Sequence, residues 1–227
     1  MKNKYHFFGL IPAKKKSERL KNKNLLKLKN KTLLEIAINE SLNSKLINDT
    51  YVSTNSKKIF KISLKAYAKV VIRSNKYSSD KAPSSHVIMD FINQLKLGQK
   101  PNSYVVYLQP TSPFRNHFHI DKAIRSFVKS KKKTLISFKL SNKSILKNYY
   151  LKNKIITPVY PNGIMTNFED LPEVYTPNGS IFIFKAKDFL KNKNSIFKNF
   201  YPFFMDDNSS IDIDNKADYL HAKSLLK

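Results

Sequence analysis

Short apolar runs alternate with amphipathic stretches along the first part of the chain. The pattern of a buried strand recurs at residues 7–12, 50–54, 69–73, 104–108 and 134–138. Between these runs, apolar side chains recur at helical spacing in stretches that begin near residues 32, 56, 84 and 117. Strict alternation of strand and helix predicts an α/β, Rossmann-like fold, with a mostly parallel sheet and helices on both faces.

The local signals at the first predicted helix are specific. Thr32 precedes the helical pattern and Glu35 follows three residues later, which is the sequence pattern of a capping box. The helix after residue 108 is predicted to run from His117 to Ser130.

The regular pattern stops after residue 138. Residues 139–176 are polar, aromatic and proline-containing, with no clear period. Residues 180–184 alternate as in a strand, and a final helix is predicted at about residues 215–226. We interpret residues 1–227 as a single domain, with an inserted excursion at 139–176.

The charge of the chain points first toward nucleic acid. The formal net charge is +26 at pH 7, yet of 42 lysines and arginines only four are arginines: Arg19, Arg73, Arg115 and Arg125. Proteins that read bases and clamp phosphates favour the bidentate arginine fork, and the lysines here are dispersed along the sequence. We therefore interpret the charge as compositional drift in an AT-rich genome and do not expect nucleic acid as a partner.

The composition also limits the kinds of site and the location. The chain has no cysteine, which excludes disulfides and thiolate metal sites. No run approaches the roughly 20 apolar residues needed to cross a bilayer, and the first residues have too short an apolar core for a secretion signal. We expect a cytoplasmic protein without membrane contact.

The loop that follows the first strand is a candidate phosphate site. Residues 13–24 carry several cations, among them Lys14 and Lys23, together with the hydroxyl of Ser17 and the amide of Asn24. The loop has no glycine, so its backbone amides cannot approach a phosphate as closely as in glycine-rich loops. Side-chain cations would have to carry more of the binding. The alternative is a cluster of solvated lysines.

Near the other end of the chain, Asp212 and Asp214 stand two residues apart between isoleucines. In an extended segment both carboxylates project to the same side and can share one divalent cation. The alternative is a pair of turn or helix-capping aspartates before the last helix. A triphosphate loop combined with metal-binding carboxylates indicates nucleotidyl transfer.

Two further turns follow predicted strands or lie near them. Residues 109–115 join a glutamine, two prolines and an arginine at the end of an apolar strand, and residues 175–179 end in Gly179. A stiff polar turn of the first kind suits ligand contact because little ordering entropy is lost on binding. Taken alone, the sequence of each segment favours an ordinary turn.

Six segments, taken in order, resemble the acylneuraminate cytidylyltransferase family, which includes the CMP-sialic acid synthetases and their legionaminic and pseudaminic acid relatives. The segments are IPAKKKSERLKNKN, VSTNS, RSNKYSSDKAPSS, YLQPTSPFR, LPEVYTPNGSIFIF and SIDIDNKAD. They span nearly the whole chain. The family fold is of the nucleotide-diphospho-sugar transferase type.

The resemblance implies transfer of CMP from CTP to the anomeric hydroxyl of a nine-carbon nonulosonic acid, with release of pyrophosphate. Carried over residue by residue, it implies a nucleotide site at Ala13, Lys14, Ser17, Lys23, Asn24, Arg73 and Ser85. It implies sugar contacts at Gln109, Thr111, Ser112 and Asn178. Lys23 and Asp212 would be catalytic, and Asp212 and Asp214 would hold Mg²⁺. The excursion at 139–176 would form a dimerisation element, giving a homodimer.

The chain departs from the family pattern at two places that bear on substrates. Lys14 replaces an arginine, which exchanges a two-pronged donor for a point charge. Phe168 occupies the place of an arginine that, in the family, contacts the sugar carboxylate from the partner subunit.

Two alternatives remain. Cytidylyltransferases for the eight-carbon acid Kdo share part of the opening motif, but they carry a QGDEP-like turn where this chain has QPTSP. The other alternative is a non-catalytic basic binder of nucleic acid or anionic surfaces on the same fold.

Overall fold

The computed structural model of the chain describes residues 5–15, 17, 19–77, 83–191 and 198–226. Lys16 and Glu18 of the predicted phosphate loop lie outside the described residues. Within the described ranges, no helix is long and apolar enough to cross a membrane.

A seven-stranded sheet forms the centre of the molecule, in the order β11-β7-β10-β6-β1-β4-β5. The strands are β1 (His6–Pro12), β4 (Asp49–Thr54), β5 (Lys69–Ile72), β6 (Ser103–Leu108), β7 (Thr134–Ser141), β10 (Val174–Lys185) and β11 (Phe200–Phe204). Only β10 runs antiparallel to its neighbours, β6 and β7; the other pairs are parallel. The prediction of a mostly parallel sheet is confirmed.

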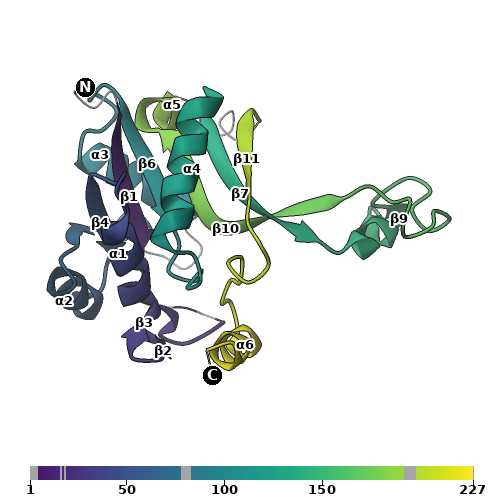
Figure 1. The fold of residues 1–227 in the computed structure, drawn as a ribbon, viewed down its shortest axis with the longest axis horizontal. Helices are drawn as coiled ribbons and strands as arrows, with labels where there is room; N and C mark the ends of the chain where they lie inside the picture. Colours follow the sequence, from purple (N-terminus) through teal and green to yellow (C-terminus); the bar gives the residue numbers. More distant parts are fainter. Residues whose placement is uncertain (1–4, 16, 18, 78–82, 192–197, 227) are drawn as a thin grey trace.

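Helices cover both faces of this sheet, as predicted (Figure 1). One face carries α1 (Leu33–Asn43), α2 (Lys57–Lys65) and α4 (His117–Ser130), and the other carries α3 (Ser84–Gln94) and α5 (Ala186–Lys191). Phe7 and Ile11 of β1 pack in the first layer, whereas Phe8 and Leu10 pack in the second. This follows from the two-residue period of a strand, which sends successive side chains to opposite faces.

Side chains at the helix starts explain several boundaries. The Thr32 hydroxyl accepts a hydrogen bond from the Glu35 backbone N–H, and the Glu35 carboxylate accepts one from the Thr32 N–H, so the predicted capping box is present. The Ser56 side chain accepts from the Ile59 N–H at the start of α2, and Asn116 forms a capping box with His119 at the start of α4. Such caps satisfy backbone donors that have no partner within the helix.

The excursion at 139–176 is an arm that projects from the end of the sheet (Figure 1). β7 and β10 continue pairing beyond the sheet, from Pro177 with Phe138 to Val174 with Ser141. The short helix η3 (Lys143–Lys147) and a hairpin of β8 (Tyr149–Lys152) and β9 (Ile155–Pro158) complete the arm. Large apolar side chains are exposed along it, at Leu140, Ile145, Tyr149, Tyr150, Leu151, Ile155, Ile156, Val159, Ile164, Met165 and Phe168.

Sequence periodicity did not predict several of the observed elements. β11 contains Pro202, which is tolerated because the strand lies at the sheet edge and pairs only with β7. The antiparallel pair β2 (Lys27–Leu28) and β3 (Lys31–Thr32) and the short helices η1 (Lys23–Leu25) and η2 (Asn75–Tyr77) are too brief to show a period. α6 (Lys216–Ser224), the last helix, lies within the predicted range.

Candidate active site

A cavity of about 220 Å³ opens where β1 and β6 end. Such a position, at the carboxyl ends of neighbouring parallel strands, is where open α/β sheets bind ligands. Its walls come from the loop after β1, the end of β5, the start of α3 and the turn after β6. They comprise Pro12, Lys14, Ser17, Lys23, Asn24, Arg73, Ser84, Val87, Tyr107, Gln109, Pro110 and Thr111.

The cationic loop meets the aspartate pair at the edge of this cavity. The Lys23 ammonium group donates to Asp214 Oδ1 over 2.9 Å, and Arg19 Nη1 lies 3.0 Å from Asp214 Oδ2. Burial alone would raise the pKa of Asp214, but hydrogen bonds and charge from Lys23 and Arg19 outweigh it, so the pKa is lowered. Asp214 therefore stays ionised while it holds the loop against the end of the chain.

Asp212 has a different environment. Ile213, between the two aspartates, is buried in a small core with Leu28 and Leu33. Burial raises the pKa of Asp212, opposed by a hydrogen bond from Thr111, and the charge of Asp214 raises it further. Among the described atoms, Asp212 Oδ1 is buried without a hydrogen-bond partner. An unpartnered buried carboxylate oxygen calls for a cation.

The aspartates do not cap the last helix, which was the alternative interpretation. The side chain of Asn215 accepts from the Asp218 N–H and forms the capping box of α6 with Asp218. The Asp214 backbone N–H also donates to Asp218 Oδ2, over 2.8 Å. Capping of α6 therefore uses neither the Asp212 nor the Asp214 carboxylate.

Arg73 is buried at the end of β5. Its Nη2 donates to the Ser53 carbonyl over 3.0 Å and its Nε to the Ser53 hydroxyl over 3.3 Å. The adjacent Ser74 donates to the buried Asp90 from both its N–H and its hydroxyl. Burial lowers the pKa of Arg73, with Tyr107 and Asp90 opposing that change. These contacts fix the guanidinium group at the cavity wall before any ligand arrives.

The turn after β6 links the cavity to the aspartate segment. The Thr111 carbonyl accepts from the Ile213 N–H over 2.9 Å, and the Thr111 hydroxyl oxygen lies 3.3 Å from Gln109 Oε1. Gly179 adopts a positive φ of 70°, and a Cβ there would lie 3.4 Å from Gln109 Oε1. Only glycine adopts that backbone conformation freely, so Gly179 lets β10 pass close to the Gln109 side chain.

A second cavity, of about 250 Å³, adjoins the first and shares Ser84, Tyr107 and Gln109 with it. Ser85 and Ile88 of α3 and three aromatic rings complete its lining: Phe182, Phe184 and Phe189. Burial raises the pKa of the Tyr107 hydroxyl, opposed by its hydrogen bond with Ser84. The two cavities form one site with a cationic half and a largely apolar half, divided by Gln109 and Tyr107.

A family model described as Cytidylyltransferase matches residues 8–201 of the chain. The chain belongs to the cytidylyltransferase family. The N-acylneuraminate cytidylyltransferase of Escherichia coli O18:K1:H7 (strain RS218 / NMEC) is 31% identical over 93% of this chain and 50% of its own length. The CMP-N,N'-diacetyllegionaminic acid synthase of Legionella pneumophila is 28% identical, over 96% of this chain and 95% of its own. The chain spans about half the length of the N-acylneuraminate cytidylyltransferases that it matches.

A solved structure agrees with the fold of this chain. A CMP:2-keto-3-deoxy-manno-octonic acid synthetase complexed with CTP has a TM-score of 0.75 and 13% identity, covering 97% of this chain and 98% of that chain. At such low identity the likeness shows the fold alone. The predicted family and fold class are both confirmed.

Most of the residues predicted for the site gather at the two cavities. Lys14, Ser17, Lys23, Asn24, Arg73, Gln109 and Thr111 line the first, and Ser85 lines the second rather than the first. Asp212 and Asp214 contact lining residues of the first. Their individual roles stay predictions.

Besides Asp212 and Asp214, three predicted residues line neither cavity. Ala13 and Ser112 are buried. The Ala13 backbone N–H donates to the Ser53 carbonyl, which continues the pairing of β1 with β4. Asn178 is also buried: its Oδ1 accepts from Ser137, and its Nδ2 donates to Ser210 over 2.8 Å. Asn178 thereby anchors the segment that carries Asp212, which is a positioning contact. A direct sugar contact at Ser112 or Asn178 stays a prediction.

Sequence reasoning missed the aromatic half of the site. Tyr107 was assigned to a buried strand, and Phe182 and Phe184 to an alternating strand, without a role in the site. Phe189 lies on α5, which was not predicted. The alternation of side chains along a strand could have indicated this role. Tyr107 lies two residues before Gln109, and its side chain is on the face of the sheet opposite to that of Leu108.

The donor set suits a hard divalent cation held in part by its substrate. In the described ranges, no three His, Cys, Asp or Glu side chains gather as a metal site. Mg²⁺ typically takes one or two protein carboxylates and fills its other positions with water and substrate phosphates. The unpartnered Asp212 Oδ1 and the neighbouring Asp214 fit that requirement.

Proposed function

We propose that this chain transfers CMP from CTP to the anomeric hydroxyl of a nonulosonic acid and releases pyrophosphate. The 2.9 Å contact between Lys23 and Asp214 carries the proposal, because it joins the cationic loop and the aspartate pair at one cavity. Relatives named for N-acylneuraminate, legionaminic and pseudaminic acids support the substrate class.

In this proposal the first cavity holds the nucleotide. Lys14 and Lys23 line it and place positive charge where a triphosphate would lie, while Ser17 and Asn24 offer hydrogen bonds. The Asn24 amide donates to the Lys14 carbonyl over 3.2 Å, which supports the loop itself. Arg73, already fixed by Ser53, would meet the base and sugar of cytidine with little further ordering.

The chemistry is a single in-line displacement. The anomeric oxygen forms a bond to the α-phosphorus of CTP, and the bond from that phosphorus to the oxygen bridging to the β-phosphorus breaks. Pyrophosphate leaves with the bridging oxygen, and the hydroxyl proton passes to the medium in the overall balance. Because no enzyme nucleophile is needed, positioning and charge stabilisation supply the catalysis. Lys23 is the residue that we assign to the developing charge on the leaving phosphates.

Asp212 and Asp214 would hold Mg²⁺, which offsets negative charge on the triphosphate when bound. The buried position of Asp212 supports this assignment, since its free oxygen gains a partner. Asp214 also keeps Lys23 and Arg19 in place.

The second cavity would receive the sugar acid. Gln109 lies between the two halves and can hydrogen-bond a sugar hydroxyl or amide, while Phe182 and Ile88 offer apolar surface for acyl or methyl groups. The sugar hydroxyl would then lie next to the nucleotide half. Lys143 Nζ lies 6.0 Å from the Phe168 ring centre on the arm, so a cation stands beside the place where the family has an arginine.

We also propose that the arm pairs two copies of the chain. The arm exposes more apolar side chains than a free surface element ordinarily carries. Ile155 and Ile156 on β9 are each about two-thirds exposed, at 66% and 69%. A homodimer would bury them.

The decisive experiment measures pyrophosphate release from CTP by the whole chain. The acceptors are neuraminic, legionaminic and pseudaminic acids, with Kdo and no acceptor as comparisons, each with Mg²⁺ or with a chelator. We expect release only with a nonulosonic acid and Mg²⁺, and no release from Asp212→Ala.

Other outcomes select the alternatives. Release with Kdo alone would assign the chain to the eight-carbon class. No release with any acceptor, combined with retention on DNA at near-physiological salt, would favour the non-catalytic basic binder.

A further inference from the structure

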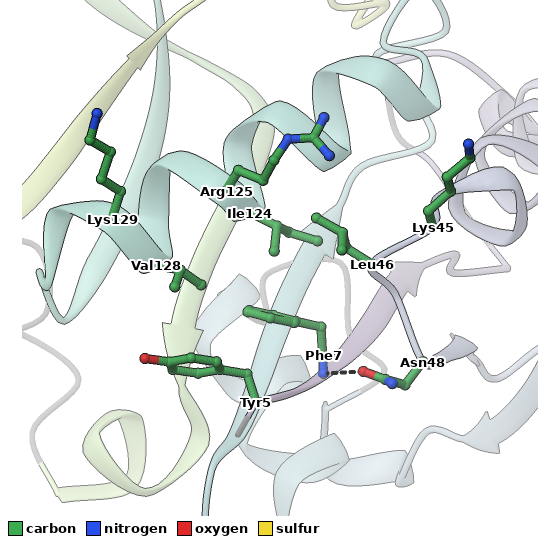
Figure 2. Close-up of a pocket in the computed structure, with 9 residues that line it drawn as sticks. All are labelled: Tyr5, Phe7, Lys45, Leu46, Asn48, Ile124, Arg125, Val128 and Lys129. Atoms are coloured by element: carbon green, nitrogen blue, oxygen red, sulfur yellow. Dashed lines mark hydrogen bonds between the residues drawn. The ribbon is translucent and has the colours of Figure 1, made fainter. Parts of the chain in front are cut away.

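A separate cavity of about 420 Å³ lies at the opposite end of β1 from the proposed active site. Tyr5 and Phe7, at the start of β1, form one wall, whereas the active site begins where β1 ends, at Pro12. The connection between α1 and β4 supplies Lys45, Leu46 and Asn48, and the second half of α4 supplies the rest (Figure 2). Nothing in the proposed transfer reaction uses this cavity.

The inner surface of the cavity is apolar. In Figure 2 the side chains of Phe7, Leu46, Ile124 and Val128 point toward one another, with the Tyr5 ring beside them. The Tyr5 ring stacks on Phe7, with ring centres 6.1 Å apart. This surface resembles the apolar lining of small-molecule sites, and the volume falls in their usual range of about 300–1,000 Å³.

Hydrogen bonds hold this end of β1 in place. The Phe7 N–H donates to Asn48 Oδ1 over 2.8 Å (Figure 2). The Asn48 N–H donates back to the Phe7 carbonyl over 2.9 Å. The Asn48 side chain therefore faces the backbone of β1, and one wall of the cavity is formed in the absence of a ligand. A preformed wall reduces the ordering cost of binding.

Three cationic side chains also line the cavity: Lys45, Arg125 and Lys129. Their charged ends lie on one side of the apolar group in Figure 2. No acidic residue lines the cavity, and none of the three cations forms a salt bridge with a described carboxylate. Asp121, one turn before Arg125, accepts instead from the Ser44 hydroxyl and the Lys45 N–H.

One of the cations at this cavity is an arginine, although only four of the 42 lysines and arginines of the chain are arginines. Of the four arginines, Arg19 and Arg73 belong to the proposed active site, and Arg115 is buried where it donates to the Gln109 carbonyl. Arg125 is the fourth, and it lines this separate cavity. A guanidinium group selects planar or tetrahedral oxyanions because it can donate two parallel hydrogen bonds.

We propose that this cavity binds a small organic anion with an apolar or aromatic body and one carboxylate, sulfonate or phosphate group. The apolar body would lie against Phe7, Leu46 and Ile124. The anionic group would lie between Arg125 and its two lysine neighbours. This site is independent of the proposed transfer reaction, so either can fail without the other.

The test compares two dyes that share one apolar body. Anilinonaphthalene sulfonate carries an anionic group, and N-phenylnaphthylamine lacks it. Each is titrated into the whole chain with ¹³C-labelled methyl groups, so that shifts at Leu46, Ile124 and Val128 report this cavity. We expect saturable shifts at these three methyl positions with the sulfonate, and at least about fivefold weaker binding of the neutral dye, as loss of ion-pair contacts worth about 1 kcal/mol gives.

Variants separate this cavity from other apolar surface. Arg125→Gln and Lys129→Gln should each weaken binding of the sulfonate about two- to fivefold and leave the neutral dye unaffected. Lys122→Gln is the matched control, because Lys122 is exposed on the same helix and does not line the cavity. Val128→Phe should weaken both dyes by filling the space.

Three results would overturn the proposal. The first is a set of shifts confined to methyl groups of the arm, such as Ile155. The second is equal affinity for the two dyes. The third is equal loss of binding in Lys122→Gln and Arg125→Gln.

Discussion

Lys23 and Asp214 are 191 residues apart in the sequence, yet the lysine ammonium group lies 2.9 Å from Asp214 Oδ1. This contact closes the loop after β1 onto the segment before α6. It brings the cations and the carboxylates of the site to one place.

Replacing Lys23 should separate catalysis from folding. We expect Lys23→Ala to lower turnover by at least about a hundredfold, because a preorganised charge at the developing phosphate is lost. Arg19 still pairs with Asp214, so the circular dichroism spectrum should be unchanged. The measurement is pyrophosphate release, with Lys21→Ala, at an exposed lysine of the same loop, as the control. Near-normal turnover of Lys23→Ala would remove Lys23 from its assigned role.

Lys14→Arg restores the side chain that the family carries at this place. Lys14 lines the nucleotide cavity, and an arginine can donate two parallel hydrogen bonds to a phosphate. We expect the KM for CTP to stay equal or to fall, with kcat retained. Lys15→Arg, next to it on an exposed position, should change neither constant. A sharp rise in KM for Lys14→Arg would show that the loop binds differently.

Asp212→Asn should abolish activity and preserve or raise stability. Burial raises the pKa of Asp212 above its value in the unfolded chain, so ionised Asp212 opposes folding as the pH rises through the raised pKa. A neutral amide removes that penalty and also removes a metal ligand. Thermal unfolding at pH 7 and pyrophosphate release measure the two effects, with Asp207→Asn at an exposed aspartate as control. A clear fall in Tm together with retained activity would contradict both assignments.

Asp214 should affect acid stability in the opposite sense. Its folded-state pKa is lowered, so its contribution to stability is present above the unfolded value near 3.8 and is lost as the pH falls through the lowered pKa. Urea unfolding from pH 7 to pH 2 measures the free energy of unfolding for the parent chain and Asp214→Asn. The difference between them should shrink below about pH 4. A constant difference across the range would mean that the ion pairs with Lys23 and Arg19 contribute nothing.

A charge on the arm should weaken the proposed dimer. Ile156→Lys places an ammonium group in an interface that the dimer would bury, so we expect the dimer dissociation constant to rise at least about tenfold. The residue is exposed in the single chain, so Tm of the monomer should hardly change. Analytical ultracentrifugation compares it with Leu64→Lys, an exposed leucine of α2. A parent chain that stays monomeric at high concentration would end the dimer proposal.

Local spacing was enough to predict many elements. The capping box at Thr32 and Glu35 depends on residues three apart, and the range of α4 depends on a period within one helix. Such signals act between near neighbours, so they are readable without knowledge of the rest of the chain. The order of the sequence motifs indicated the family, and the family in turn indicated most of the residues that line the first cavity.

Long-range packing set the remainder of the site. The order of the strands brings β10 beside β6, which places Phe182 next to Tyr107 and builds an apolar cavity that no local pattern indicates. The Asn178 amide joins Ser137 of β7 to Ser210, two segments far apart in the sequence, and its predicted sugar contact stays a prediction.

From the order of its residues alone, the chain specifies where strands and helices begin and which chemical groups it can offer. Which of those groups meet depends on the order of the strands in the sheet. Contacts such as Lys23 with Asp214 join segments far apart in the sequence, and no local pattern indicates that they meet. The same holds for the arm, whose strands are visible only once β7 and β10 pair beyond the sheet.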